Sequence, residues 1–301
     1  MAAWPEKARG MPSLGLALVI FAGGIAAGVI AALLGVGGGI LMVPLLTMVF
    51  GVPVPSAQGA SLVAAVLASD AACLWPSKRS LMDVSQAWSL CLATTFGATI
   101  GAMVALRSSP EILQALFALL LIYTAVQLAR PKRRSNEAGS ARQQPKPSRL
   151  RLALMPLVGL FAGASSGLLG IGGGVIVVPA LHLILRKPFK VSTATSNLII
   201  GVTSLTGAFT YWLSGRLLPL PTLAVAAGAF VGALIGSAID RRLSSRVLRI
   251  GMAILLTYVA LQIGNTILGA RRQMGALPVE PAPYAQIRGL LWTPIPLPPH
   301  H

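Results

Sequence analysis

The sequence contains very few charged residues. Only 10% of its 301 residues are Asp, Glu, Lys or Arg, whereas soluble domains carry about 25%. Hydrophobic residues make up 55% of the chain, and the mean hydropathy is +0.77. This composition excludes an ordinary soluble domain and predicts an all-α integral membrane protein.

Cysteines and catalytic motifs are equally scarce. The two cysteines, Cys73 and Cys91, both lie in apolar segments, which is typical of buried thiols rather than of a disulfide framework or a metal site. The sequence has no HExxH motif, no paired carboxylates and no Ser/His/Asp arrangement. We therefore expect no enzyme activity, no cofactor and no bound metal.

Acidic residues are far outnumbered by basic ones. The chain has 24 Lys and Arg residues against seven Asp and Glu residues, so its formal net charge is +17. In membrane proteins, Lys and Arg collect in cytoplasmic loops. The excess charge therefore predicts a biased topology in a multi-pass protein of the cell inner (plasma) membrane. We expect the lipid bilayer, and not nucleic acid, as its partner.

The most unusual stretch in the chain is a glycine-rich break in an apolar run. LLGVGGGILMVPLL at residues 33–46 has three consecutive glycines followed by a proline, and LLGIGGGVIVVPAL at residues 168–181 matches it at nine of fourteen positions. The offset of 135 residues also aligns Ser61 with Ser196 and continues without a gap. The chain is therefore an internal duplication.

A basic linker rich in Pro, Ser and Gln joins the two copies, and this composition is typical of a solvated, disordered connection. We expect the linker to be cytoplasmic because of its positive charge. The predicted parts are an N-terminal tail at 1–13, a first transmembrane repeat at 14–129, the linker at 130–151, a second transmembrane repeat at 152–268 and a flexible C-terminal tail at 269–301.

Each repeat contains five apolar segments, of which the second is short. A membrane span needs about 20 residues, and the second segment of each repeat has only about 15. It either re-enters the membrane, which gives four crossings per repeat, or crosses from a glycine loop that already lies inside the membrane. The segments lie near 14–34, 36–50, 56–75, 85–106 and 111–129, and near 152–169, 171–185, 191–212, 220–239 and 247–268.

Loop charge favours five crossings. With the linker in the cytoplasm, five crossings put nine Lys and Arg residues in short inner loops and two in short outer loops, whereas four crossings give three against eight. The inner set is Lys78, Arg79, Arg186, Lys187, Lys190, Arg241, Arg242, Arg246 and Arg249, and the outer set is Arg107 and Arg216. An odd number of crossings inverts the second repeat. The sequence therefore predicts about ten transmembrane helices as two inverted five-helix repeats, with short glycine-headed second helices.

Inversion brings the two glycine loops together near the membrane midplane, where they could form an anion site. The first turn of a helix has free N–H groups and about +0.5 charge, and glycine lets the backbone approach a ligand. The alternative is that the glycines only allow close helix packing. The candidate substrate-binding glycines are Gly35, Gly37, Gly38 and Gly39 in the first repeat, and Gly170, Gly172, Gly173 and Gly174 in the second.

Polar residues at the start of the third segment of each repeat are the other candidate substrate ligands. They are Gln58, Ser61, Thr195, Ser196 and Asn197. Hydroxyl and amide donors suit an oxyanion that must also be released. The alternative is that the hydroxyls bond to their own helix or bridge two helices.

Asp70 is the one carboxylate well inside a predicted span. Ionisable residues in the membrane are costly and by default mark ion or proton pathways, so Asp70 is a candidate for proton coupling. The alternative is an interfacial ion pair with Lys78 or Arg79. The aligned residue in the second repeat is Leu205, so either role would be asymmetric.

The doubled glycine–proline motif, followed by QGASL from Gln58 and TATSNL from Thr193, resembles the TauE/SafE-type sulfite exporter family over residues 14–268. One departure is SKRSLM from Ser77 against SGRLLP from Ser214. The resemblance implies a bacterial permease for sulfite, sulfoacetate or another sulfur-containing organic anion, without fixing which one. An exporter of neutral or cationic metabolites remains the alternative. Expected partners are a small anionic substrate, lipid and protons, with a homodimer left open.

Overall fold

The computed structural model describes residues 13–74, 81–109, 112–113, 115–116, 119–120, 149–185 and 187–239. The chain divides into two units, Met1–Ile263 and Gly264–His301. Every described residue belongs to the first unit. The predicted C-terminal tail, most of the linker and the fifth segment of the second repeat lie outside the described residues, as does most of the fifth segment of the first.

Every regular element in the described ranges is a helix, which agrees with the predicted all-α class. Each repeat supplies a long helix, a short helix that follows the glycine loop, and two more long helices. The first repeat forms α1 (Ser13–Leu34), α2 (Gly39–Pro44), a π-helix η2 (Leu45–Val49), α3 (Val54–Leu74) and α5 (Val84–Arg107). The second repeat forms α7 (Arg149–Leu169), α8 (Gly174–Leu183), α9 (Phe189–Leu213) and α10 (Pro219–Ile239).

The helix ends lie close to the predicted segments, with one adjustment. Helix α7 begins at Arg149, inside the range assigned to the linker, so the last residues of that range are helical. The second helices are short, as predicted: α8 has 10 residues, and α2 with η2 covers 11 residues from Gly39 to Val49. Pro44 and Pro179 lie inside these short helices. Because a proline has no N–H and clashes with the preceding turn, it distorts the helix there.

Four described helices are long and apolar enough to cross a membrane: Gly15–Leu34, Val54–Leu74, Leu90–Arg107 and Pro219–Ile239. Helix α7 contributes a shorter apolar stretch, Leu154–Leu169. Large apolar side chains such as Phe96, Phe161 and Leu223 point outward and are about two-thirds exposed. An outward apolar surface of this kind suits contact with lipid.

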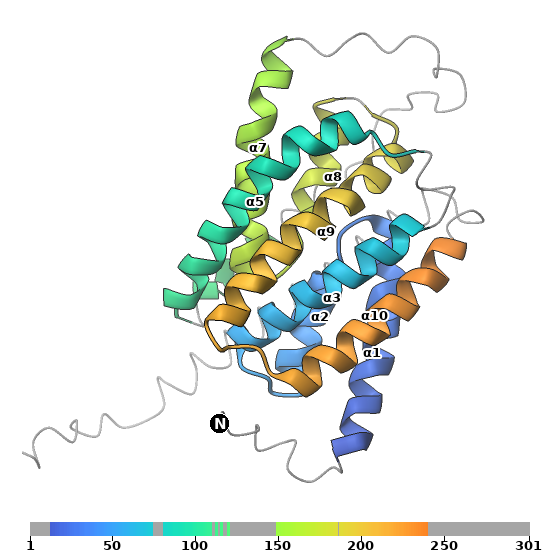
Figure 1. Cartoon of the computed structure of the whole chain (residues 1–301), viewed down its shortest axis with the longest axis vertical. Coiled ribbons are helices and arrows are strands. Elements are labelled where there is room, and N and C mark those ends of the chain that lie inside the picture. Colours follow the sequence, from blue (N-terminus) through green and yellow to red (C-terminus); the bar gives the residue numbers. More distant parts are fainter. Residues whose placement is uncertain are drawn as a thin grey trace, which may run out of the picture. The chain divides into compact units, whose positions relative to one another are not determined.

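The two repeats are interlocked, because the first helix of each packs on the fourth helix of the other. Helix α1 lies along α10, and α7 lies along α5 (Figure 1). Glycines bring the backbones into contact: a Cβ on Gly28 would lie 2.8 Å from the Ala229 Cα, and one on Gly163 would lie 2.7 Å from the Thr94 Cα. Small residues allow this close approach where no hydrophobic effect drives helix association.

Helices α3 and α9 occupy the centre between these outer pairs (Figure 1). They are related by the repeat, contact each other and run in opposite directions, as do α1 and α7. Helix α9 carries a mainly polar stretch from Ser192 to Asn197, and all six residues of this stretch are buried. The two central helices therefore present polar side chains to the glycine loops.

Candidate substrate site at the glycine loops

The two glycine loops have the same backbone conformation. The φ angles of Gly35, Gly37 and Gly38 are +65°, +80° and +74°. Their repeat partners Gly170, Gly172 and Gly173 have +72°, +82° and +75°. A residue with a Cβ is strained by about 1–2 kcal/mol in this left-handed region. Three glycines of each motif are thus explained by backbone conformation.

The loops also touch each other. A Cβ on Gly39 would collide with the carbonyl oxygen of Gly170, and one on Gly174 would lie 2.5 Å from the oxygen of Gly35. The start of each short helix therefore packs on the glycine loop of the other repeat. The two loops lie in contact, as expected for inverted repeats, whereas their role in binding an anion stays a prediction.

The first glycine of each loop packs on the third helix of the other repeat. A Cβ on Gly35 would lie 2.8 Å from the Cα of Thr193, and one on Gly170 would lie 2.8 Å from the Cα of Gln58. Thr193 and Gln58 are themselves related by the repeat. At these positions glycine is needed for close packing, which was the alternative to substrate binding.

Ser61 and Ser196 tie the two loops to the central helices. The Ser61 hydroxyl donates to the carbonyl oxygen of Gly170 at 2.7 Å, and the Ser196 hydroxyl donates to that of Gly35 at 2.9 Å. Both serines are fully buried. A hydroxyl has one proton to donate, so in this arrangement both protons are committed to the protein. The two serines fix the loops, and their predicted contact with substrate would require these bonds to change.

Gln58 belongs to a buried hydrogen-bond cluster. Its Nε2 donates to the carbonyl oxygen of Leu168 at 3.0 Å. The hydroxyl of Tyr211 lies 3.0 Å from Gln58 Oε1 and 3.0 Å from the oxygen of Gly167. Tyr211 is fully buried, and no sequence pattern assigned it this role. The cluster links α3 to α7 and α9, so the Gln58 side chain positions the helix before the second glycine loop.

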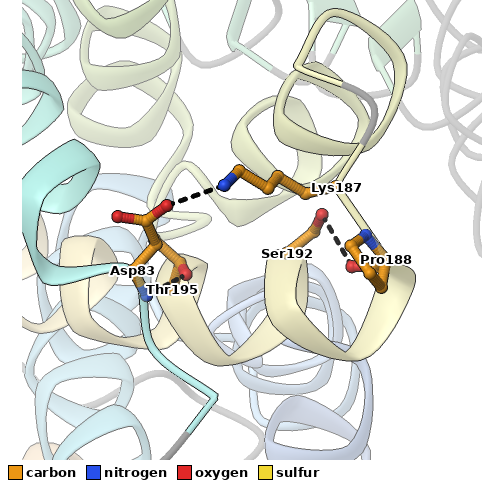
Figure 2. A network of polar contacts seen from close by, with 5 residues as sticks. All are labelled: Asp83, Lys187, Pro188, Ser192 and Thr195. Atoms are coloured by element: carbon orange, nitrogen blue, oxygen red, sulfur yellow. Dashed lines mark hydrogen bonds and ion pairs between the residues drawn. The ribbon is translucent and has the colours of Figure 1, made fainter. Parts of the chain in front are cut away.

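Thr195 takes part in a different network, at the start of α5 (Figure 2). Its Oγ1 accepts a hydrogen bond from the Asp83 N–H at 3.0 Å. The Asp83 carboxylate forms an ion pair with the Lys187 ammonium at 2.9 Å, and both side chains are about a quarter exposed. Sequence reasoning treated Lys187 only as a loop charge and overlooked Asp83, because the two lie 104 residues apart.

Asn197 and Asp70 make no contact that settles their predicted roles. Asn197 is buried, and its Nδ2 has no hydrogen-bond partner within the described ranges. Asp70 lies near the end of α3 on its exposed side, with Oδ1 only 3.1 Å from where a Cβ on Gly201 would lie. The alternative partners Lys78 and Arg79 lie outside the described residues. Substrate binding by Asn197 and proton coupling by Asp70 stay predictions.

Comparison with known proteins identifies the family. The model of the family described as "Sulfite exporter TauE/SafE" matches residues 20–263. The chain belongs to the TauE/SafE family. The match confirms the resemblance that the doubled glycine–proline motif indicated. The protein is therefore a membrane transporter of the TauE/SafE family. No solved structure is significantly similar to it.

Relatives of this TauE/SafE protein all carry transporter names. "Probable membrane transporter protein YunE" of Bacillus subtilis is 29% identical over 261 residues, which cover 80% of this chain and 94% of YunE. A "probable membrane transporter protein" of Methanocaldococcus jannaschii is 31% identical over 65% of this chain and 72% of its own. Another, from Xylella fastidiosa strain Temecula1, is 29% identical over 76% and 87%. These names give neither a substrate nor a direction.

Proposed function

We propose that this TauE/SafE protein is an inner-membrane permease that exports a small sulfur-containing anion, either sulfite or an organosulfonate. The observation that carries the proposal is the pair of glycine loops, which meet inside the protein and are held there by reciprocal serine bonds. A membrane potential that is negative inside favours the exit of an anion by about 2.3 kcal/mol per charge per 100 mV. Export therefore needs no coupled proton.

The proposed fold has ten transmembrane helices in two inverted repeats. With five crossings per repeat, residues 83 and 187 both face the linker side, whereas with four crossings residue 187 would face the opposite side. The ion pair between Asp83 and Lys187 holds the two residues at one end. This contact supports five crossings, as does the opposite direction of α1 and α7 (Figure 1).

The interlocked packing gives this fold a simple way to alternate access. Helix α1 packs on α10 and helix α7 packs on α5 through similar glycine contacts. The α1–α10 pair and the α5–α7 pair are therefore two structurally equivalent halves of the protein. A small movement of one half against the other can exchange which end is closed while the loops remain at the centre. Inverted-repeat transporters work in this way, with substrate bound near the midplane.

The chemistry around the loops suits an anion. No Lys or Arg occurs at residues 13–74, 152–185 or 191–215. These ranges include α1, α3, α8 and most of α7 and α9. Within these segments the donors beside the loops are therefore hydroxyl, amide and backbone N–H groups, and the dipole of a helix N-terminus favours negative charge. Neutral donors bind an anion without a permanent ion pair, which permits its release.

Transport into sealed vesicles tests the proposal. The purified protein, reconstituted in proteoliposomes with a set pH gradient, should move labelled sulfite or an alkyl sulfonate, and unlabelled anion should compete. A protein-free vesicle sets the background rate. Competition by neutral or cationic metabolites but not by anions would contradict the proposal and support the alternative exporter class.

A further inference from the structure

Two buried serines flank the second glycine loop without forming hydrogen bonds of their own. Ser166 on α7 and Ser204 on α9 are both fully buried. Neither hydroxyl has a hydrogen-bond partner in the part of the chain that the structure describes. A Cβ on Gly173 would lie 3.4 Å from the Ser166 Cβ, and one on Gly172 would lie 3.2 Å from the Ser204 Oγ. The serines therefore border the loop directly before α8.

These hydroxyls are exceptions within their own helices. Ser165, next to Ser166, donates to the carbonyl oxygen of Ala162 at 2.9 Å, and Thr203, next to Ser204, donates to that of Ile199 at 2.7 Å. Bonding back to the helix is the usual solution for a hydroxyl in an apolar environment. A buried hydroxyl without a partner costs stability, so each case calls for an explanation.

The first glycine loop lacks one of the two hydroxyls. The repeat partner of Ser166 is Ala31, whose Cβ would lie 3.0 Å from a Cβ on Gly38. The first loop thus meets a methyl group where the second meets a hydroxyl. Helix α2, with six residues before its π-helical continuation, is also shorter than α8, with ten. The hydroxyl beside Gly173 therefore has no counterpart beside Gly38 in the first loop.

We propose that Ser166 and Ser204 are side-chain donors to the transported anion, which binds at the Gly172–Gly174 backbone and the N-terminus of α8. This inference rests on the proposed function and deepens it. In the first turn of α8, the N–H groups of Ile176 and Val177 donate to the Gly173 carbonyl oxygen, which leaves those of Gly174 and Val175 as further donors. Ser61 and Ser196, in contrast, act as positioning residues because their protons hold the loops.

The same geometry restricts the class of substrate. The described segments that border the loop contain no Lys or Arg, so within the described residues neutral donors and a helix dipole balance the charge on the ligand. The cost of removing a charge from water rises steeply with that charge and is high without a cationic partner. The site therefore fits a singly charged oxyanion headgroup, such as an alkyl sulfonate or hydrogen sulfite, and not a dianion such as sulfate.

Thermal unfolding of the full chain in detergent, with and without anion, tests the inference. The probes are methanesulfonate and sulfate, and the variants are Ser166→Ala, Ser204→Ala and the control Ser165→Ala. Without anion, Ser166→Ala and Ser204→Ala should unfold at or above the wild-type temperature, because each removes a buried hydroxyl without a partner. Methanesulfonate should stabilise wild type and Ser165→Ala. Its Kd should rise about tenfold or more in each of the other two variants.

Three outcomes would overturn the inference. Equal methanesulfonate affinity in wild type, Ser166→Ala and Ser204→Ala would show that the hydroxyls do not bind the anion, while leaving the proposed function intact. Sulfate that stabilises wild type as strongly as methanesulfonate would exclude the singly charged class. Stabilisation by a neutral or cationic solute but by no anion would remove the proposed function and the inference together. If an alanine variant fails to fold, the near-isosteric Ser166→Cys and Ser204→Cys carry the same test.

Discussion

Replacing Gly35 with alanine tests the contact between the two repeats. The residue has a φ of +65°, which costs about 1–2 kcal/mol for a residue with a Cβ. The new Cβ would also lie 2.8 Å from both the Cα and the carbonyl oxygen of Thr193. Overpacking of this kind typically costs about 1–3 kcal/mol. We therefore expect Gly35→Ala to lower the free energy of unfolding by about 2–5 kcal/mol.

Gly215 offers a matched control on the surface. Its φ is +68°, and a Cβ there would meet nothing within 4 Å. Gly215→Ala should therefore cost only the conformational part, about 1–2 kcal/mol. The effect of alanine on the unfolded chain is common to both variants and cancels in the comparison. The difference between the two variants, about 1–3 kcal/mol, measures the packing of the first loop against α9.

The assay is unfolding of both variants in mixed micelles, followed by transport in proteoliposomes. Gly35→Ala should be less stable than Gly215→Ala and should lose transport, because the loop can no longer lie against the Thr193 backbone. Adding Thr193→Ala should not restore stability, since two of the three nearest atoms are backbone atoms that the substitution leaves in place. Equal stability of Gly35→Ala and Gly215→Ala would refute the proposed contact between the first loop and α9.

Three further predictions concern topology, coupling and the ion pair. On a background without Cys73 and Cys91, cysteines at residue 187 and in the 130–151 linker should react from the same side of the membrane, and labelling of the two from opposite sides would exclude five crossings. Asp70→Asn should abolish the dependence of transport on a pH gradient while sparing anion exchange at equal pH, and an unchanged dependence would remove Asp70 from proton coupling. Asp83→Asn and Lys187→Met should each destabilise the protein by about 1 kcal/mol or less, because the side chains are partly exposed. Their effects should be less than additive in the double variant, and strict additivity would contradict a direct interaction.

The helices were predictable because their signals are local. Apolar runs of about 20 residues fixed the long helices, and glycines and prolines fixed the short ones. The contact between the glycine loops was expected from two local signals together, the internal duplication and the loop charges that predict inversion of the second repeat. The ion pair between Asp83 and Lys187 had no such signal, because it joins residues 104 positions apart and has no counterpart in the other repeat.

Sequence reasoning located the polar residues of the site better than their partners. Ser61 and Ser196 were predicted as substrate ligands, which stays a prediction, and the loop carbonyl groups that they bond belong to the opposite repeat. Tyr211 went unassigned because its burial depends on how α9 packs against α3 and α7. Ser166 was not predicted, because the feature that distinguishes it is a buried hydroxyl without a hydrogen-bond partner, and no sequence pattern reveals such a group.

Positions at which the two repeats agree and positions at which they differ serve different purposes. The shared glycines and the pair Ser61 and Ser196 build the same loop twice, and so they define the scaffold. The ends of the protein, in contrast, are chemically unlike. Where one end has the ion pair of Asp83 and Lys187, the repeat-related positions at the other are Leu218 and Val52, which pack in one hydrophobic cluster.

The ion pair at one end and the hydrophobic cluster at the other respond differently to salt concentration. A partly exposed ion pair is weakened by salt, whereas apolar contacts are not screened. The two ends of the protein therefore need not open with equal ease, although the helices around them are equivalent. The shared residues therefore build the scaffold of both repeats, and the residues at which the repeats differ set the chemistry of each end.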